Sequence, residues 1–141
     1  MLFDAYEVGR TLTTPPRTIT AADIEQFATL TGDHNPLHLD DEYAAGTIFG
    51  RRIAHGLLVQ SCAIGLVTDL IDTRHVIAFR ALETTFKKPI YIDDLIRVDL
   101  TVVDKKMIRR LKAGNVSLDF RVLNSDDEIV QQGRWQLLIK E

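Results

Sequence analysis

The sequence predicts an α+β fold in which a curled antiparallel sheet of about five strands wraps around a long central apolar helix. Two observations carry this prediction. Residues 54–71 are apolar around most of the circumference of a helix, so other elements must cover them. The second half of the chain alternates apolar and polar residues, as strands with one buried face do. The chain has 141 residues, 45% of them hydrophobic, which is enough for one domain over residues 1–141.

A first helix is predicted between Thr20 and Gly32. Thr20 is a suitable N-cap, Asp23 stands at the third helical position of a capping box, and Gly32 is a typical helix stop. Residues 33–52 then form a long polar connection with one short helical turn near residues 41–45. Connections of this length in a small domain are usually functional.

The remaining elements are strands. A strand-like piece precedes Pro15, and four longer strands are predicted over residues 76–88, 96–103, 115–122 and 129–139. Turn-forming residues at 112–115 and 124–127 join the last three as hairpins.

Composition excludes several classes of protein. The net charge is −3 and neither half of the chain is strongly basic, so we expect no nucleic-acid partner. The apolar stretch over residues 53–71 is interrupted by polar residues, and we expect no membrane span. A lone Cys62 and the absence of a leader-like start favour a reducing, cytoplasmic setting.

The polar connection carries the candidate chemistry. It contains Gly-Asp-His-Asn-Pro-Leu-His over residues 32–38. Pro36 biases Asn35 away from helix, so we expect Asp33 and His38 to be held at a common point as an acid–base pair. Histidine ordinarily titrates near about 6.5 and suits a base, whereas aspartic acid titrates near about 3.9 and must be partly desolvated to donate a proton. We therefore expect an apolar tunnel around the pair.

These residues resemble a known family. The motif at residues 32–38, with Asp40 two residues on, and the block Phe-Gly-Arg-Arg-Ile-Ala-His-Gly at residues 49–56 look like the hydratase-2 motif of the MaoC-like dehydratases. Members of this family include the (R)-specific enoyl-CoA hydratases, which have a hot-dog fold. The resemblance implies a hydro-lyase that reversibly hydrates trans-2-enoyl-CoA to (R)-3-hydroxyacyl-CoA. It implies no cofactor and no metal, an acyl thioester of coenzyme A or of acyl carrier protein as substrate, and a homodimer.

The resemblance also assigns roles to residues. Asp33 and His38 match the family's catalytic pair, Asn35 the residue that orients them, and the backbone N–H of Gly56 the donor to the thioester oxygen. A helix that begins near residue 55 would present free N–H groups there. The acyl tail would follow this helix, with Leu57, Leu58, Gln60 and Ser61 as candidate lining residues.

Other interpretations stay open at this stage. A non-catalytic acyl-thioester-binding module and an acyl-CoA thioesterase are the rival functions. His34 and His38 could be read as metal ligands, although Pro36 between them argues against a shared helix face. His55 is interpreted as a buried structural histidine. Coenzyme A phosphates could meet the basic run at residues 105–112 or its rivals, which are Arg51, Arg52, Lys87 and Lys88.

One departure from the family pattern concerns the residues that follow the central helix. Family members often have a glycine before the aspartate of the motif that begins at Pro89, and Asp93 stands there instead. The Pro-Gly pair common after the central helix is replaced by residues 72–75, so the acyl pocket is less well predicted than the catalytic residues.

Overall fold

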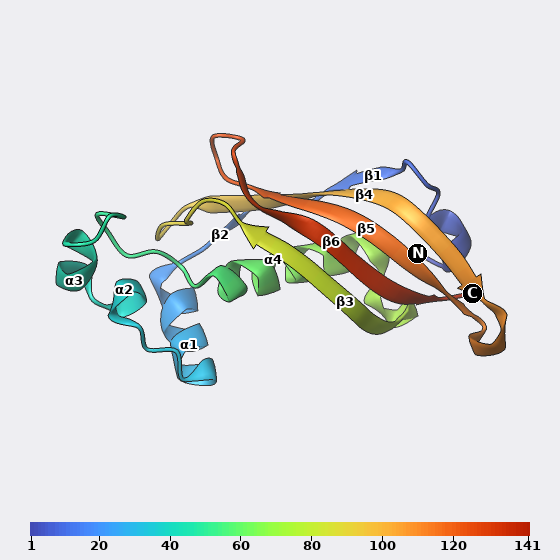
Figure 1. The fold of residues 1–141 in the computed structure, drawn as a ribbon, viewed down its shortest axis with the longest axis horizontal. Helices are drawn as coiled ribbons and strands as arrows, with labels where there is room; N and C mark the ends of the chain where they lie inside the picture. The colour runs from blue at the N-terminus through green and yellow to red at the C-terminus, as the bar shows by residue number, and fades with distance from the viewer.

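A computed structural model describes residues 1–141 as one antiparallel sheet of six strands lying along a long helix (Figure 1). The strands run in the order β1-β4-β5-β6-β3, and β2 also pairs with β4. The strands are β1 (Thr11–Thr13), β2 (Arg17–Thr18), β3 (Val76–Phe86), β4 (Leu95–Ile108), β5 (Ala113–Leu123) and β6 (Ile129–Lys140). The helices are α1 (Ala21–Thr31), α2 (Pro36–Leu39), α3 (Asp41–Ala45) and α4 (Gly56–Ile71). The predicted α+β class and its central helix are confirmed.

The elements begin and end where local chemistry dictates. Thr20 and Asp23 form both bonds of the predicted capping box at the start of α1. Gly32 ends α1 in the left-handed conformation, with φ of 80°. Strand β4 continues beyond the predicted residue 103, because pairing with β5 persists to Ile108. The β4–β5 turn consequently lies at residues 109–112, slightly earlier than predicted.

Helix α2 was not predicted, since Pro36 was interpreted only as a loop residue. Proline is tolerated at the first position of a helix, where its missing N–H would have no partner. Here Pro36 takes that position and Asn35 caps the helix by accepting a hydrogen bond from the Leu37 N–H at 3.0 Å.

The core lies between α4 and one face of the sheet. Buried side chains of α4 meet inward-facing side chains of β4, β5 and β6, among which Phe120 and Trp135 stack with ring centroids 4.6 Å apart. The expectation that α4 is covered on all sides is wrong for a single chain. Leu57, Ser61 and Asp69 lie on an exposed stripe of α4, because the sheet covers only one side of the helix.

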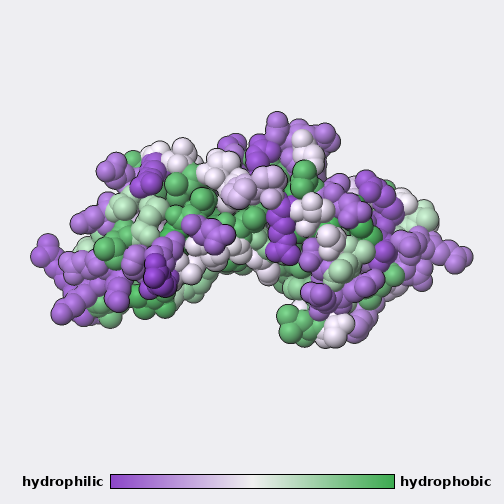
Figure 2. All heavy atoms as spheres, turned by 180° about the vertical axis from the view of Figure 1, so that it is seen from behind, coloured by the Kyte–Doolittle hydropathy of each residue, from purple (hydrophilic) through white to green (hydrophobic).

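Strand β3 forms an edge of the sheet and keeps apolar side chains exposed. Phe79, Leu82 and Phe86 are 42%, 44% and 52% exposed. In the pairing of β3 with β6 they stand opposite Leu137, Trp135 and Gln131, whose side chains are buried. Directly opposite residues share a face of the sheet, so the three β3 side chains lie on its core-facing side. Viewed from behind, hydrophobic atoms gather over the middle of the molecule, on the side of α4 (Figure 2).

Candidate active site

The loop between α1 and α2 is shaped by short-range hydrogen bonds. The Asp33 N–H donates to Thr31 Oγ1 at 3.2 Å, and the Asn35 N–H donates to Asp33 Oδ1 at 3.3 Å. The Asn35 side chain caps α2, the helix that carries His38. Asn35 therefore contacts one member of the predicted pair through its backbone and supports the other through the helix cap.

His38 is buried and its ring is fixed by a backbone carbonyl. Its Nδ1 lies 2.7 Å from the carbonyl oxygen of Ile53. Because a carbonyl only accepts, Nδ1 carries the proton, and in the neutral ring Nε2 keeps a free lone pair. A lone pair held in this way is what a general base requires.

His55 is buried, as predicted, but it also belongs to the site. Its ring lies against that of His38, with centroids 3.9 Å apart and the ring planes tilted by 30°, and its Nε2 donates to the backbone oxygen of Asp33 at 3.1 Å. Its Nδ1 is buried without a partner. Burial, followed by the nearby His38, lowers the pKa of His55 below its usual 6.5. A neutral His55 thus joins the start of α4 to the Asp33 loop.

Asp33, His38 and His55 come together at one point. A carboxylate oxygen of Asp33 and one ring nitrogen of each histidine all lie within 4.8 Å of one another. These three side chains are the ones whose atoms are close enough to share a metal ion; His34, which the metal interpretation invoked, is exposed and is not among them. Asp33 is exposed as well, so a single chain does not supply the expected apolar enclosure.

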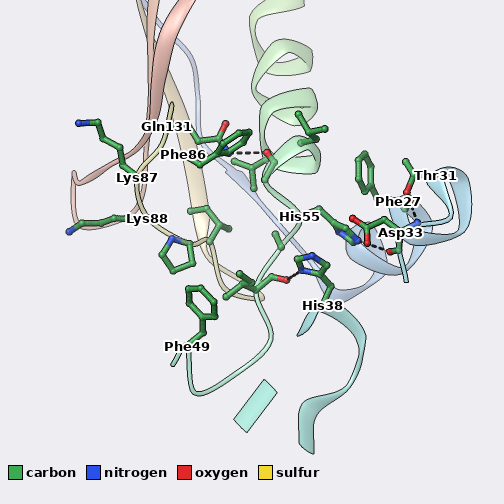
Figure 3. A pocket seen from close by; sticks show the side chains of 17 residues that line it. Phe27, Thr31, Asp33, His38, Phe49, His55, Phe86, Lys87, Lys88 and Gln131 are labelled. Carbon is green, nitrogen blue, oxygen red and sulfur yellow. Dashed lines mark hydrogen bonds between the residues drawn. The ribbon is translucent and has the colours of Figure 1, made fainter. Parts of the chain in front are cut away.

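A cavity of about 660 Å³ opens beside this cluster (Figure 3). Asp33, His38 and Gly56 all line it. Sequence reasoning did not single out its other prominent lining residues, because they come from separate elements with no motif in common. These residues are Phe27, Phe86 and Gln131; Phe49, the first residue of the block at residues 49–56, lines the cavity as well.

Gly56 begins α4 at the wall of the cavity. Its N-cap, His55, makes no side-chain cap bond, and the first N–H that bonds back to the His55 carbonyl is that of Val59. The first amides of α4 are therefore available to a ligand. A Cβ at position 56 would lie 2.7 Å from the Phe86 ring, so any other residue there would force this half-exposed ring to move.

Of the four residues predicted to line the acyl tail, one lies at the cavity. Leu57 lines the cavity, whereas Leu58 and Gln60 are buried elsewhere and Ser61 is exposed away from it. Their positions follow from helical spacing, since only the first turn of α4 reaches the cavity.

The candidate phosphate-binding residues lie in different places, and two of them are at the cavity. Lys87 and Lys88 line the cavity, and Lys88 pairs with Glu128. Arg52 pairs with Asp41 at 2.7 Å. The basic run at residues 105–112 lies on the β4–β5 hairpin, at the opposite end of the sheet from the cavity (Figure 1).

No helix of the structure combines the length and the apolar character that crossing a membrane requires.

Solved structures place the fold in a known class. The chain superposes on a monoamine oxidase regulatory protein of Archaeoglobus fulgidus with a TM-score of 0.92 and 38% identity, covering 100% of this chain and 95% of that one. It also superposes on a Mycobacterium tuberculosis protein described as a double hot-dog fold, with a TM-score of 0.83 and 20% identity over 99% of this chain and 44% of that one. The protein has a hot-dog fold.

The family model described as "MaoC like domain" matches residues 4–122, and the chain belongs to this family. It is 44% identical over 100 residues to Protein MaoC of Klebsiella aerogenes, which is 70% of this chain and 30% of that protein. It is 35% identical to a 3-hydroxybutyryl-CoA dehydratase of Methylorubrum extorquens, over 74% of this chain and 65% of that one. It is 34% identical to an (R)-specific enoyl-CoA hydratase of Aeromonas caviae, over 72% and 75%. The matches thus span less than two thirds of the first two relatives.

Proposed function

We propose that the protein is a hydro-lyase that reversibly adds water to trans-2-enoyl-CoA to form (R)-3-hydroxyacyl-CoA. The observation that carries the proposal is the meeting of Asp33 and His38 at a cavity whose wall is the free N-terminus of α4. The names of two relatives, a hydratase and a dehydratase of acyl-CoA thioesters, point to the same chemistry.

Each group has a defined task in this reaction. His38 Nε2 takes a proton from water as the oxygen bonds to the β-carbon of the enoyl group. Electron density moves to the thioester oxygen, which the Gly56 N–H stabilises. Asp33 gives a proton to the α-carbon, and the proton that His38 took from water returns to Asp33 before the next turnover. The thioester itself accepts the electron pair, so neither a metal nor a cofactor is part of the proposal.

The test is hydration of crotonyl-CoA, followed as loss of enoyl absorbance. Asp33→Asn and His38→Ala are each expected to lower kcat/KM by about 10²–10⁴-fold, because a proton relay of two groups fails when either is lost. Asn35→Ala should cost less. His34→Ala is the matched control and should retain full activity, because His34 is an exposed histidine inside the motif that does not belong to the cluster of Asp33, His38 and His55.

Retention of more than a tenth of wild-type activity by a folded Asp33→Asn or His38→Ala variant would overturn the assignment of the pair. The same assays with a chelator should be unchanged. Inhibition that added zinc reverses would favour a metal bound by Asp33, His38 and His55.

Two other functions remain as outcomes of this assay. An acyl-CoA thioesterase would release thiol from the same substrate, and a non-catalytic acyl-thioester-binding module would bind it without change. Free thiol measured in parallel with enoyl absorbance separates all three.

The proposed substrate range is short to medium acyl chains, of about four to eight carbons. Each buried methylene contributes about 0.8 kcal/mol until the tail reaches the end of its pocket. Three aromatic rings, of Phe27, Phe49 and Phe86, line the cavity, and that of Phe86 lies against Gly56. The carrier of the acyl group, coenzyme A or acyl carrier protein, is left to a comparison of the two thioesters.

The proposed working form is a homodimer in the cytoplasm. The exposed apolar side chains of β3 lie on the core-facing side of the sheet, next to an uncovered stripe of α4. A second copy could cover both surfaces and enclose Asp33, which one chain leaves exposed. Cys62 is buried and unpaired, consistent with a reducing setting.

A further inference from the structure

A chain of three buried polar side chains joins strand β6 to the first residue of α4. Trp135 Nε1 donates to Gln60 Oε1 at 2.8 Å, and Gln60 Nε2 donates to Gln131 Oε1 at 2.7 Å. Gln131 Nε2 then donates to the backbone oxygen of Gly56 at 2.9 Å (Figure 3). The three side chains are only 1–3% exposed.

The two ends of this chain determine the orientation of both amides. The Trp135 indole only donates and the Gly56 carbonyl only accepts. Gln131 must therefore turn its NH₂ group toward Gly56 and its oxygen toward Gln60, and Gln60 must turn its oxygen toward Trp135. Every bond then runs in the same direction, an arrangement in which neighbouring hydrogen bonds strengthen one another.

The location of the network indicates its purpose. Burying two amides costs free energy that hydrogen bonds only offset, and apolar side chains could fill the same space. The network therefore serves to fix the orientation of the groups that it connects, more than to add packing energy. Its last bond is made to the carbonyl of Gly56, at the point where α4 meets the cavity. The backbone of glycine has the widest conformational freedom, so a bond that restrains it has the most effect there.

We propose that Gln131 is a positioning residue, held by Gln60 and Trp135, which fixes the Gly56–Leu57 peptide at the start of α4 and, through the Gly56 Cα, the direction in which the Gly56 N–H faces the thioester oxygen. The proposal rests on the proposed function. The Phe86 ring contacts Gly56 as well, so Gly56 is held by a polar bond to β6 and by an apolar contact with β3.

The first experiment compares Gln131→Met with Gln132→Met in crotonyl-CoA hydration. Methionine has nearly the shape of glutamine and cannot donate to the Gly56 carbonyl. Gln132 is the next residue of β6, half-buried, and its side chain lies on the opposite face of the sheet. Loss of an oxyanion donor costs about 10²–10³-fold in kcat, so a misaimed donor should cost about tenfold, with KM within about twofold. Gln132→Met should equal the wild type.

A second measurement reports the N–H directly. The carbonyl stretch of bound butyryl-CoA, labelled with ¹³C at the thioester carbon, is read by infrared difference spectroscopy. The saturated thioester does not react, and a well-aimed N–H shifts its stretch to lower frequency. Gln131→Met should lose part of this shift. Trp135→Phe removes the first donor of the network, keeps an aromatic ring in the core and leaves the Gln131 bond to Gly56 in place. It should lose less of the shift, with a smaller fall in kcat.

The outcomes separate the two proposals. Failure of the wild type to hydrate crotonyl-CoA would overturn the proposed function. An active wild type with unchanged kcat and carbonyl frequency in Gln131→Met would overturn the role of Gln131 alone, as would an equal loss in Gln132→Met. If Gln131→Met does not fold, Trp135→Phe decides by the same two readouts, and wild-type values for it would overturn the proposal.

Discussion

The two histidines of the site have different roles, because each donates one ring N–H to a different backbone carbonyl and only one keeps its other nitrogen available. His38 donates to Ile53 and keeps Nε2 free, while His55 donates to Asp33 and buries its other nitrogen. Their ring centroids lie 3.9 Å apart. A charge on His55 would therefore lie next to the base, and burial keeps that ring neutral.

The pH dependence of stability should reveal this burial. The lowered pKa of His55 means that the unfolded state binds a proton more readily than the folded state. The contribution of His55 is complete above about pH 6.5, its unfolded value, and is lost as the pH falls below it. Urea unfolding between pH 5 and pH 8 should show this fall, and His55→Gln, which cannot titrate, should show a shallower one. Identical slopes in the two proteins would contradict it.

At the scale of elements, the turn before β4 contains a residue in a conformation that favours glycine. Asp93 adopts φ of 68°, the left-handed region that favours glycine, and its N–H donates to the Ile19 carbonyl at 2.7 Å. The aspartate thus takes the backbone conformation that a glycine adopts at lower cost. The turn is kept because Asp94 accepts a hydrogen bond from the Tyr91 N–H at 2.9 Å.

Asp93→Gly should therefore stabilise the protein, by about 0.5 kcal/mol. Relief of a left-handed cost of about 1–2 kcal/mol exceeds the entropy that glycine loses on folding, about 0.5–1 kcal/mol. The free energy of unfolding in urea measures the difference. Asp126→Gly, in an exposed turn at a residue without positive φ, is the control and should not stabilise. A lower free energy of unfolding for Asp93→Gly would show that the aspartate side chain stabilises the fold by more than its left-handed backbone costs.

At the scale of the whole molecule, the β3 edge is an apolar surface that a single chain leaves exposed. Its core-facing side carries Phe79, Leu82 and Phe86, each more than 40% exposed. A large exposed apolar surface of this kind marks an association site. Asp33 lies exposed on the same molecule, so association and catalysis are expected to depend on each other.

Sedimentation equilibrium at micromolar concentration should therefore find a homodimer. Leu82→Lys, which places a charge on the apolar side of β3, should shift the equilibrium toward monomer by at least tenfold and lower activity in parallel. Leu111→Lys changes an equally exposed leucine on the distant β4–β5 hairpin and should do neither. A fully active wild-type monomer would refute the link between assembly and catalysis.

Local pattern alone is enough to predict the α+β class, the long helix, the capping box at Thr20 and the loop that carries Asp33, whereas the short helix that carries His38 is missed. Those features depend on residues a few positions apart, where periodicity and turn chemistry act. His55 was placed correctly in the interior, but its contact with Asp33 was not foreseeable, because 22 residues separate them. The same holds for Gln131 and Gly56, which lie 75 residues apart. Their meeting depends on the packing of α4 against β6 and on the register of β3 with β6, in which Phe86 stands opposite Gln131. Long-range pairing sets that register, and only the folded chain contains it.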